Sequence, residues 1–298
     1  MARFEGIITP MITPFNRDED QSINYEAGEM LVEKLISGGV KGVFPFGTNG
    51  EFHVCSFDEK IEFSKFVIEK TAGRVPVFVG TGSCSTKEAI ELSQKAEEIG
   101  ADALSVICPY FVKPTVEDLE GYFREVAASV KIPIILYNIP GNTGTNIPPE
   151  LVAKLVDVPN IAGIKDSSGN MENLQAYLDA VEGKEFDVLV GSDSKILPAL
   201  KLGAVGAIAG TSNLITEQVV DLYNAFKEGD LERAQMRQDD IEPLRNVIHL
   251  GAQPSMIKRA LEFCGIPVGP CRKPTMESTP EKDVEVRAML DHYGFDHE

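Results

Sequence analysis

The chain has 298 residues, and 43% of them are hydrophobic, which is enough to bury a sizeable core in one large domain or two smaller ones. Its 46 acidic residues outnumber its 28 lysines and arginines, so the net charge is −18. So acidic a surface repels phosphate backbones and anionic lipid, and we expect neither a nucleic-acid partner nor a membrane partner. An anionic substrate must then be held by local donors.

The N-terminus and the cysteines suggest where the protein works. The first residues, MARFEGIITPMITPF, lack the apolar core of a signal peptide, and no stretch approaches the roughly 20 apolar residues that span a bilayer. The five cysteines are odd in number and contain no C-x-x-C pair, which is typical of reduced and mostly buried thiols. We therefore expect a cytoplasmic protein without a metal site.

Short β-branched runs alternate with longer amphipathic stretches along the whole chain. Helical patterns such as 24–39, 57–73 and 86–100 each end in glycine, a common residue just past a helix. The expected strands, in chain order, are GIIT (6–9), GVFPFG (42–47), VPVFVGTG (75–82), ADALSVICP (101–109), IPIILYNIP (132–140), IAGIKDSS (161–168), DVLVGSD (187–193) and GAVGAIAG (203–210).

These runs are apolar on both faces, which indicates a parallel sheet covered by helices. Eight strand–helix units by about residue 230 predict an α/β protein of the (β/α)8 TIM barrel type. An open doubly wound sheet is the alternative, and it is weakened because no G-x-G-x-x-G follows the first strand. We expect residues 1–230 to form the barrel and carry the active site, and 231–298 to form a C-terminal helical extension.

Catalytic groups of such barrels collect at the carboxyl ends of the strands. The sixth expected strand ends in Lys165, followed at once by Asp166 and Ser167. In one interpretation Lys165 extends to solvent or pairs with Asp166. In the other, a desolvated neutral amine adds to a ketone and forms a Schiff base. Its position at the barrel mouth brings the two interpretations nearly level.

Two further motifs lie at neighbouring strand ends. Tyr137 ends the preceding strand, about 4.8 Å from the next one, so it either caps a barrel layer or shuttles protons for a substrate shared with Lys165. The glycines of GTNGE at 47–51 fit a plain turn between strand and helix. Alternatively, its backbone N–H groups, with Thr48 and Asn49, hold a carboxylate.

Taken together, GTNGE, YNIPGNTG and GIKDSSG resemble the pyruvate-dependent Schiff-base aldolase superfamily, along essentially the whole chain. The resemblance implies that Lys165 forms an imine with a 2-keto acid such as pyruvate, with no other cofactor, and that Tyr137 is the general acid/base. Thr48 would assist the proton relay, Asn49 would bind the carboxylate, and Ile208 would line the pyruvate end. The resemblance also implies a homotetramer.

The chain departs from the dihydrodipicolinate synthase pattern at two places. That pattern has an arginine that receives the acceptor's acid group, where this chain has Asn142. Its second tyrosine is here Phe111, which cannot pass a proton, and Tyr110 could compensate only if the strand register differed by one. The GSD run, from Gly191 to Asp193, fits the neuraminate-lyase pattern, in which Asp193 would bind sugar hydroxyls, but GTN and PGNTG depart from that pattern. Gly191 is also expected at the substrate.

The motifs lie nearest to the 4-hydroxy-2-oxoglutarate aldolase branch, although some 2-keto-3-deoxy acid aldolases and dehydratases share them. We therefore expect a lyase that cleaves a 4-hydroxy-2-oxo acid to pyruvate and an aldehyde, or forms the acid from them. One alternative is 4-hydroxy-tetrahydrodipicolinate synthase, which joins pyruvate to aspartate semialdehyde. Another is a non-catalytic 2-keto acid sensor, suggested by Phe111. We expect His53 and Lys113 near the mouth of the barrel, and we favour a loop histidine without a role and an ordinary surface lysine.

Overall fold

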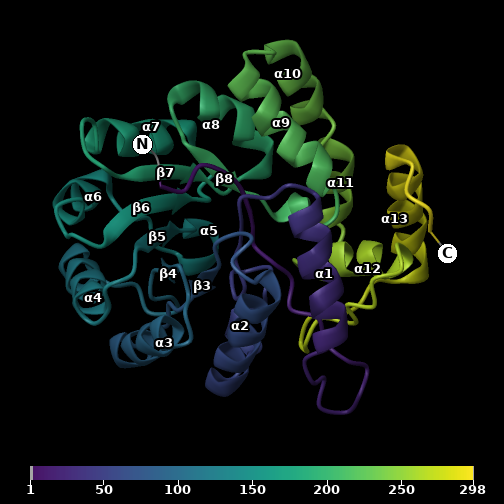
Figure 1. Cartoon of the computed structure of the whole chain (residues 1–298), viewed down its shortest axis with the longest axis horizontal. Coiled ribbons are helices and arrows are strands. Elements are labelled where there is room, and N and C mark those ends of the chain that lie inside the picture. The colour runs from purple at the N-terminus through teal and green to yellow at the C-terminus, as the bar shows by residue number, and fades with distance from the viewer. Residues whose placement is uncertain (1–2, 298) are drawn as a thin grey trace.

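A closed barrel of parallel strands forms the centre of the computed structural model, which describes residues 3–297 (Figure 1). The hydrogen-bonded order is β2-β1-β8-β7-β6-β5-β4-β3, and a parallel bridge between Val43 and Val77 closes the circle. The predicted (β/α)8 barrel is confirmed, and the open doubly wound sheet is excluded. The strands are β1 (Gly6–Thr9), β2 (Gly42–Val43), β3 (Phe78–Gly80), β4 (Ala103–Ile107), β5 (Ile134–Asn138), β6 (Ile161–Asp166), β7 (Asp187–Val190) and β8 (Gly206–Ile208).

Helices surround the barrel, and short turns follow several strands at its mouth. Side chains cap the longer helices: Ser56 and Thr115 each form a reciprocal capping box with the residue three positions on. The outer helices are α1 (Tyr25–Ser37), α2 (Phe57–Thr71), α3 (Thr86–Glu98), α4 (Val116–Ala128), α6 (Pro149–Leu155), α7 (Met171–Ala180), α8 (Ile196–Leu202) and α9 (Thr216–Glu228). The turns at the mouth are η1 (Phe52–Val54), α5 (Pro140–Thr143), η2 (Asp193–Lys195) and η3 (Gly210–Asn213).

An apolar plug fills the barrel interior below the mouth. Side chains alternate between the two faces of a strand. A residue two positions after a plug residue therefore also points into the barrel, one layer closer to the mouth. On β5 the plug residue Ile135 is followed two positions later by Tyr137, and on β7 Leu189 is followed by Gly191. The plug is therefore the floor of the site. It consists of Phe4, Ile8, Phe44, Phe78, Ala103, Ile135, Ala162, Leu189 and Ile208.

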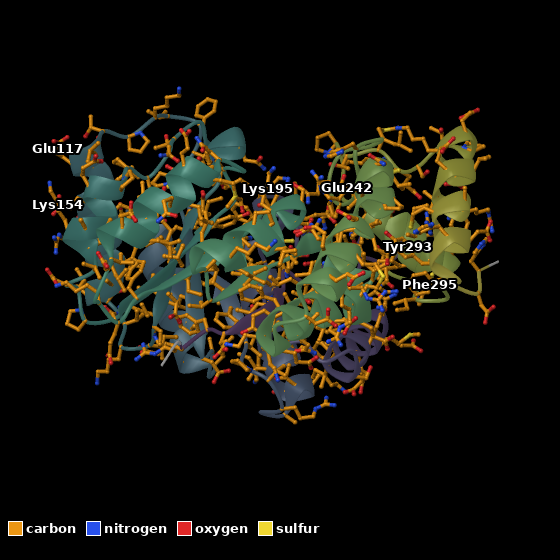
Figure 2. All side chains as sticks on the ribbon, turned by 90° about the horizontal axis from the view of Figure 1, so that it is seen from above. Glu117, Lys154, Lys195, Glu242, Tyr293 and Phe295 are labelled. Atoms are coloured by element: carbon orange, nitrogen blue, oxygen red, sulfur yellow. The ribbon has the colours of Figure 1, made fainter. Side chains whose placement is uncertain are left out.

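The C-terminal region is helical, as expected, with α10 (Leu231–Asp239), α11 (Glu242–Ile248), α12 (Ser255–Phe263) and α13 (Pro280–Tyr293). Helix α10 packs on α8 and α9, whereas α11, α12 and α13 pack on one another. Figure 2 shows α13 with Tyr293 at the opposite end of the molecule from Glu117 and Lys154. The boundary expected at residue 230 stays a prediction. Within residues 3–297, no helix has the length and apolar character that crossing a membrane requires.

A buried ion pair joins the C-terminal region to the loop after β2. Lys258 of α12 places Nζ 2.5 Å from Glu51 Oε1, and the two side chains are 2% and 3% exposed. Lys258 also donates to the carbonyl of Pro270 at 3.0 Å, and the backbone N–H of Arg272 donates to Glu51 Oε2 at 2.9 Å. Glu51 has φ 54° and ψ 35°, a left-handed conformation that surrounding contacts must hold. The C-terminal region thus anchors the loop 47–51.

Replacing Lys258 with methionine tests this anchor. Lys258→Met leaves the Glu51 carboxylate buried without its cation, so we expect the free energy of unfolding to fall by about 3–5 kcal/mol. Urea denaturation measures the change. The control is Lys201→Met, which removes an exposed lysine on α8 and should change stability by no more than about 0.5 kcal/mol. A similarly small loss for Lys258→Met would contradict the anchor.

Candidate active site

Lys165 and Tyr137 lie side by side at the carboxyl end of the barrel. Their Cα atoms are direct partners in the register of β6 and β5. Lys165 Nζ is 3.9 Å from the centroid of the Tyr137 ring and 5.4 Å from that of the Phe44 ring. Both Lys165 and Tyr137 are only 3% exposed. The apolar strand therefore delivers a primary amine to a buried position between aromatic rings.

Asp166 does not pair with this amine, although it follows directly in the sequence. Its Oδ1 accepts hydrogen bonds from Asn138 Nδ2 at 2.9 Å and from the backbone N–H of Ser168 at 3.0 Å. Its Oδ2 accepts one from Ser168 Oγ at 2.8 Å. Since these donors occupy Asp166 on the opposite face of the strand, the interpretation of Lys165 as its ion-pair partner is wrong.

Thr48 and Asn49 approach Lys165 from the loop after β2. Thr48 Oγ1 and the Tyr137 hydroxyl are 3.1 Å apart, so a proton can pass between them. Asn49 is 5% exposed, and its Oδ1 has no hydrogen-bond partner within residues 3–297. Thr211 Oγ1 is likewise buried without one. Unpartnered buried polar atoms are rare, and these two line the same cavity, so a bound ligand can satisfy them.

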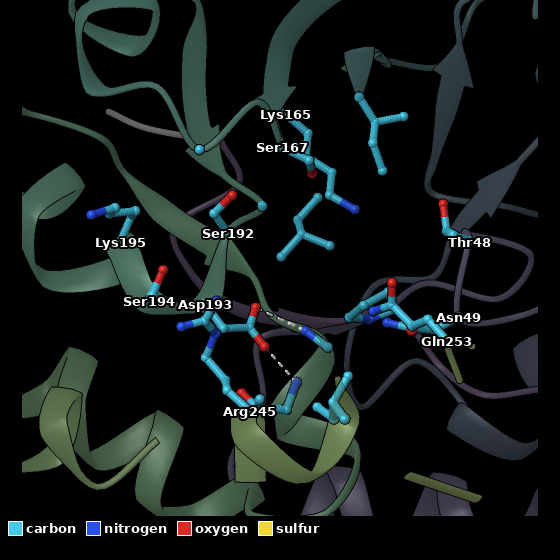
Figure 3. Close-up of a pocket in the computed structure, with 18 of the residues that line it drawn as sticks. Thr48, Asn49, Lys165, Ser167, Ser192, Asp193, Ser194, Lys195, Arg245 and Gln253 are labelled. Atoms are coloured by element: carbon cyan, nitrogen blue, oxygen red, sulfur yellow. Dashed lines mark hydrogen bonds between the residues drawn. The ribbon is translucent and has the colours of Figure 1, made fainter. Parts of the chain in front are cut away.

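The cavity above Lys165 has a volume of about 430 Å³. Figure 3 shows Thr48 and Asn49 on one side of it and Asp193 on the other, with Lys165 and Ser167 above them. Of the expected site residues, the cavity is lined by Thr48, Asn49, Tyr137, Lys165, Gly191, Asp193 and Ile208.

One wall of this cavity comes from the C-terminal region, which sequence reasoning missed. The site was expected to lie within residues 1–230. Helical periodicity identifies the apolar face of a segment, but it does not show which distant element the polar end of that segment approaches. The residues concerned are Arg245, Ile248, His249, Gly251 and Gln253.

Gly191 makes room for the lysine. A Cβ at this position would lie 2.0 Å from Ser167 Oγ and 2.7 Å from Lys165 Cε. Contacts this short force one of the side chains to move. Gly191 was expected to bind substrate, and the structure adds that its lack of a side chain is what lets Lys165 extend into the cavity.

Asp193 follows β7 and faces the cavity with a carboxylate held by backbone donors. The N–H groups of Gly210 and Thr211 donate to it at 3.1 and 2.7 Å (Figure 3). Burial raises the pKa of Asp193 above its usual range, and these two hydrogen bonds counter the effect only in part. The carboxylate is fixed in orientation by η3.

Tyr110 and Asn142 were expected to contact the same substrate as Lys165, but they do not line the cavity above it. They line a neighbouring cavity of about 220 Å³ that also contains His53 and Thr48. Asn142 lies there because the chain turns into α5 directly after β5. Desolvation raises the pKa of the Tyr110 phenol to about 12.

Phe111 and two basic residues that follow β4 lie outside both cavities. Phe111 has φ 77° and is 96% exposed, so it contacts neither cavity. Arg124, a second cation beside Lys113 in that part of the chain, forms an ion pair with Glu120 on the outside of α4. Lys113 lines neither cavity described above.

Residues 3–293 match the model of the dihydrodipicolinate synthetase family. The chain belongs to this family. It is 38% identical over 291 residues to the 4-hydroxy-tetrahydrodipicolinate synthase of Methanoculleus marisnigri, which covers 98% of this chain and 100% of the relative. Its fold matches the dihydrodipicolinate synthase of Aquifex aeolicus with a TM-score of 0.95 and 34% identity, covering 99% and 100% of the two chains.

A second solved structure of the dihydrodipicolinate synthetase family, from Acinetobacter baumannii, was crystallised in complex with pyruvate. It matches this chain with a TM-score of 0.93 and 32% identity, covering 98% of this chain and 99% of that one. The resemblance to the Schiff-base aldolase superfamily is thereby confirmed. The protein is an enzyme of this family, a lyase-type aldolase that uses a Schiff-base lysine.

Filling the space at Gly191 tests whether Lys165 needs it. In Gly191→Ala the new methyl group displaces Lys165 or Ser167, so we expect the yield of a borohydride-trapped pyruvate adduct, read by intact mass, to fall at least about tenfold. The control is Gly121→Ala on α4, where the added Cβ meets nothing within 4 Å. A wild-type yield from a folded Gly191→Ala protein would show that the space is dispensable.

Proposed function

We propose that this protein joins pyruvate to an aldehyde, or splits the product of that reaction, through an imine on Lys165. One observation carries the proposal: a buried primary amine stands beside Tyr137 in a cavity, and its neighbouring acid is occupied elsewhere. Among residues 3–297 no carboxylate forms an ion pair with Lys165, so its amine is available to attack a carbonyl. No cofactor beyond the lysine is needed.

The chemistry follows from the positions of the side chains. Lys165 adds to C2 of pyruvate and water leaves, which gives an iminium that can accept the electron pair of a C3–H bond. Loss of a C3 proton forms an enamine, which attacks the aldehyde carbon and forms the new C–C bond; hydrolysis then frees the amine. Tyr137, whose hydroxyl is 3.1 Å from Thr48 Oγ1, moves the protons. Asn49 and Thr48 hold the pyruvate carboxylate, and Ile208 packs at its methyl end.

We assign the acceptor first to aspartate semialdehyde, which makes the protein a 4-hydroxy-tetrahydrodipicolinate synthase. Relatives that are 36–38% identical across at least 97% of this chain carry that name, and this favours the alternative over our leading expectation from the sequence. The non-catalytic sensor is not retained, since the family is one of enzymes.

A second candidate, a 4-hydroxy-2-oxo acid aldolase, rests on Asn142. The synthase pattern has an arginine there, and an asparagine cannot bind a carboxylate bidentately. The cavity that contains Asn142 is lined by no lysine or arginine. An acceptor held at that position thus lacks the expected cation.

We also propose that a second copy of the chain covers the loop after β4. Phe111 and its neighbour Val112 are 96% and 73% exposed, an unusual pair for the tip of a surface loop. A neighbouring subunit would bury them close to Thr48 and the smaller cavity. The homotetramer and the cytoplasmic location expected from the sequence are part of this proposal.

Borohydride trapping tests the imine. Incubation with pyruvate and borohydride should add one reduced pyruvyl group to the protein, and peptide mapping should place it on Lys165. Lys165→Arg keeps the charge but cannot form the imine, so it should remain unlabelled. A wild-type protein that also remains unlabelled would end the proposal.

Turnover distinguishes the two acceptors. We expect kcat/KM for pyruvate with aspartate semialdehyde to exceed, by at least about tenfold, kcat/KM for cleavage of 4-hydroxy-2-oxoglutarate, because relatives that are 36–38% identical across nearly the whole chain are named for the former reaction. A coupled assay for each product measures both. The reverse order would assign the enzyme to the second candidate.

A further inference from the structure

Asn49 and Gly210 lie against each other at the wall of the cavity above Lys165. Asn49 comes from the loop after β2, and Gly210 begins η3, which follows β8. A Cβ on Gly210 would lie 2.7 Å from Asn49 Nδ2 and 3.7 Å from Asp193 Oδ2. The first distance is shorter than a side-chain carbon tolerates, so a residue other than glycine would force a neighbour to move. The φ of Gly210 is not in the left-handed region, and glycine is therefore needed here for space alone.

The backbone at Gly210 is held on both sides and cannot retreat from such a clash. Its N–H donates to Asp193 Oδ1 at 3.1 Å (Figure 3), and its carbonyl accepts from Asn213 Nδ2 at 2.9 Å. Asn213 is completely buried, and its Nδ2 also donates to the carbonyl of Pro10 at 3.0 Å. The turn η3 is thereby tied to the loop after β7 and to the loop after β1.

The backbone of Asn49 is held as well. The carbonyl of Gly50, the next residue, accepts from Thr13 Oγ1 at 2.7 Å, and Glu51 forms the buried ion pair with Lys258. By contrast, no hydrogen bond within the described part of the chain holds the Asn49 amide, whose Oδ1 is buried without a partner. Since both backbones are fixed and the amide is not, a side chain at position 210 would turn the amide.

We propose that Gly210 is a positioning residue for the reaction: its missing side chain lets the Asn49 amide lie against η3, from where it binds the carboxylate of the 2-keto acid. The inference rests on the proposed function, which assigns that carboxylate to Asn49 and Thr48. The sizes of residues 49 and 210 are therefore coupled. A larger residue at position 210 is accommodated only beside a shorter one at position 49.

The pyruvate dependence of borohydride trapping tests the coupling. In Gly210→Ala the amide no longer meets the carboxylate, so we expect the half-saturating pyruvate concentration to rise about tenfold, the factor for one lost charge-assisted hydrogen bond. The yield at saturating pyruvate should stay at the wild-type level, because Lys165 is not displaced. In the background of Asn49→Ser, whose side chain ends short of the added methyl group, the same Gly210→Ala change should alter the half-saturating concentration less than about twofold.

The matched control is Gly121→Ala, where the added Cβ meets nothing within 4 Å and the half-saturating concentration should not change. An unchanged value for a folded Gly210→Ala protein, or an equal rise in both backgrounds, would overturn the coupling. If Gly210→Ala does not fold, the double variant Asn49→Ser/Gly210→Ala should fold, because the shorter side chain removes the contact. A double variant that also fails to fold would overturn the coupling as well.

Crystal structures of the ligand-free wild type and of Gly210→Ala separate this inference from the imine. We expect the Asn49 amide to rotate in the variant while the backbone of η3 stays in place. An unmoved amide, with η3 displaced instead, would contradict the role of Gly210. This comparison needs no pyruvate adduct, so an unlabelled wild-type protein counts against the imine alone.

Discussion

The direct pairing of Tyr137 with Lys165 across β5 and β6 is the constraint on which the site depends. Parallel pairing fixes which side chains are neighbours, and alternation along each strand fixes which of them point into the barrel. The apolar plug below them excludes water from one side, and the rings of Phe44 and Tyr137 flank the amine. Lys165 is thereby held beside Tyr137 in a position from which its amine can attack a carbonyl.

The rest of the molecule supports that pair in two ways. Gly191 leaves room for the lysine on the next strand, and the buried Lys258–Glu51 ion pair anchors the loop that carries Thr48. The C-terminal region therefore does more than extend the barrel: it holds a catalytic loop through α12 and closes one wall of the cavity through α11. The C-terminal region therefore bounds the space beside the proposed pyruvate site.

Much of this was predictable from the sequence, because it depends on local patterns. Apolar runs gave the strands, and polar residues after them gave Thr48, Tyr137 and Lys165, which the barrel topology must bring to one end. Contacts between distant segments were not predictable in this way. Nothing in the helical pattern around Arg245 shows that it lines the same cavity as Lys165, and the motif containing Asn142 does not show that α5 carries it to a neighbouring cavity. The exposed position of Phe111 was not predictable either, because it depends on the backbone φ of 77°, which turns the side chain outward.

Family membership establishes the class of chemistry, whereas the choice of aldehyde is a separate question, which Asn142 raises. The central claim concerns the bond between Lys165 and pyruvate, and a crystal structure of the protein grown with pyruvate tests it most directly. The account predicts continuous density from Lys165 Nζ to C2 of pyruvate, with the carboxylate against Thr48 and Asn49. Pyruvate bound without that bond, or bound away from Lys165, would contradict it.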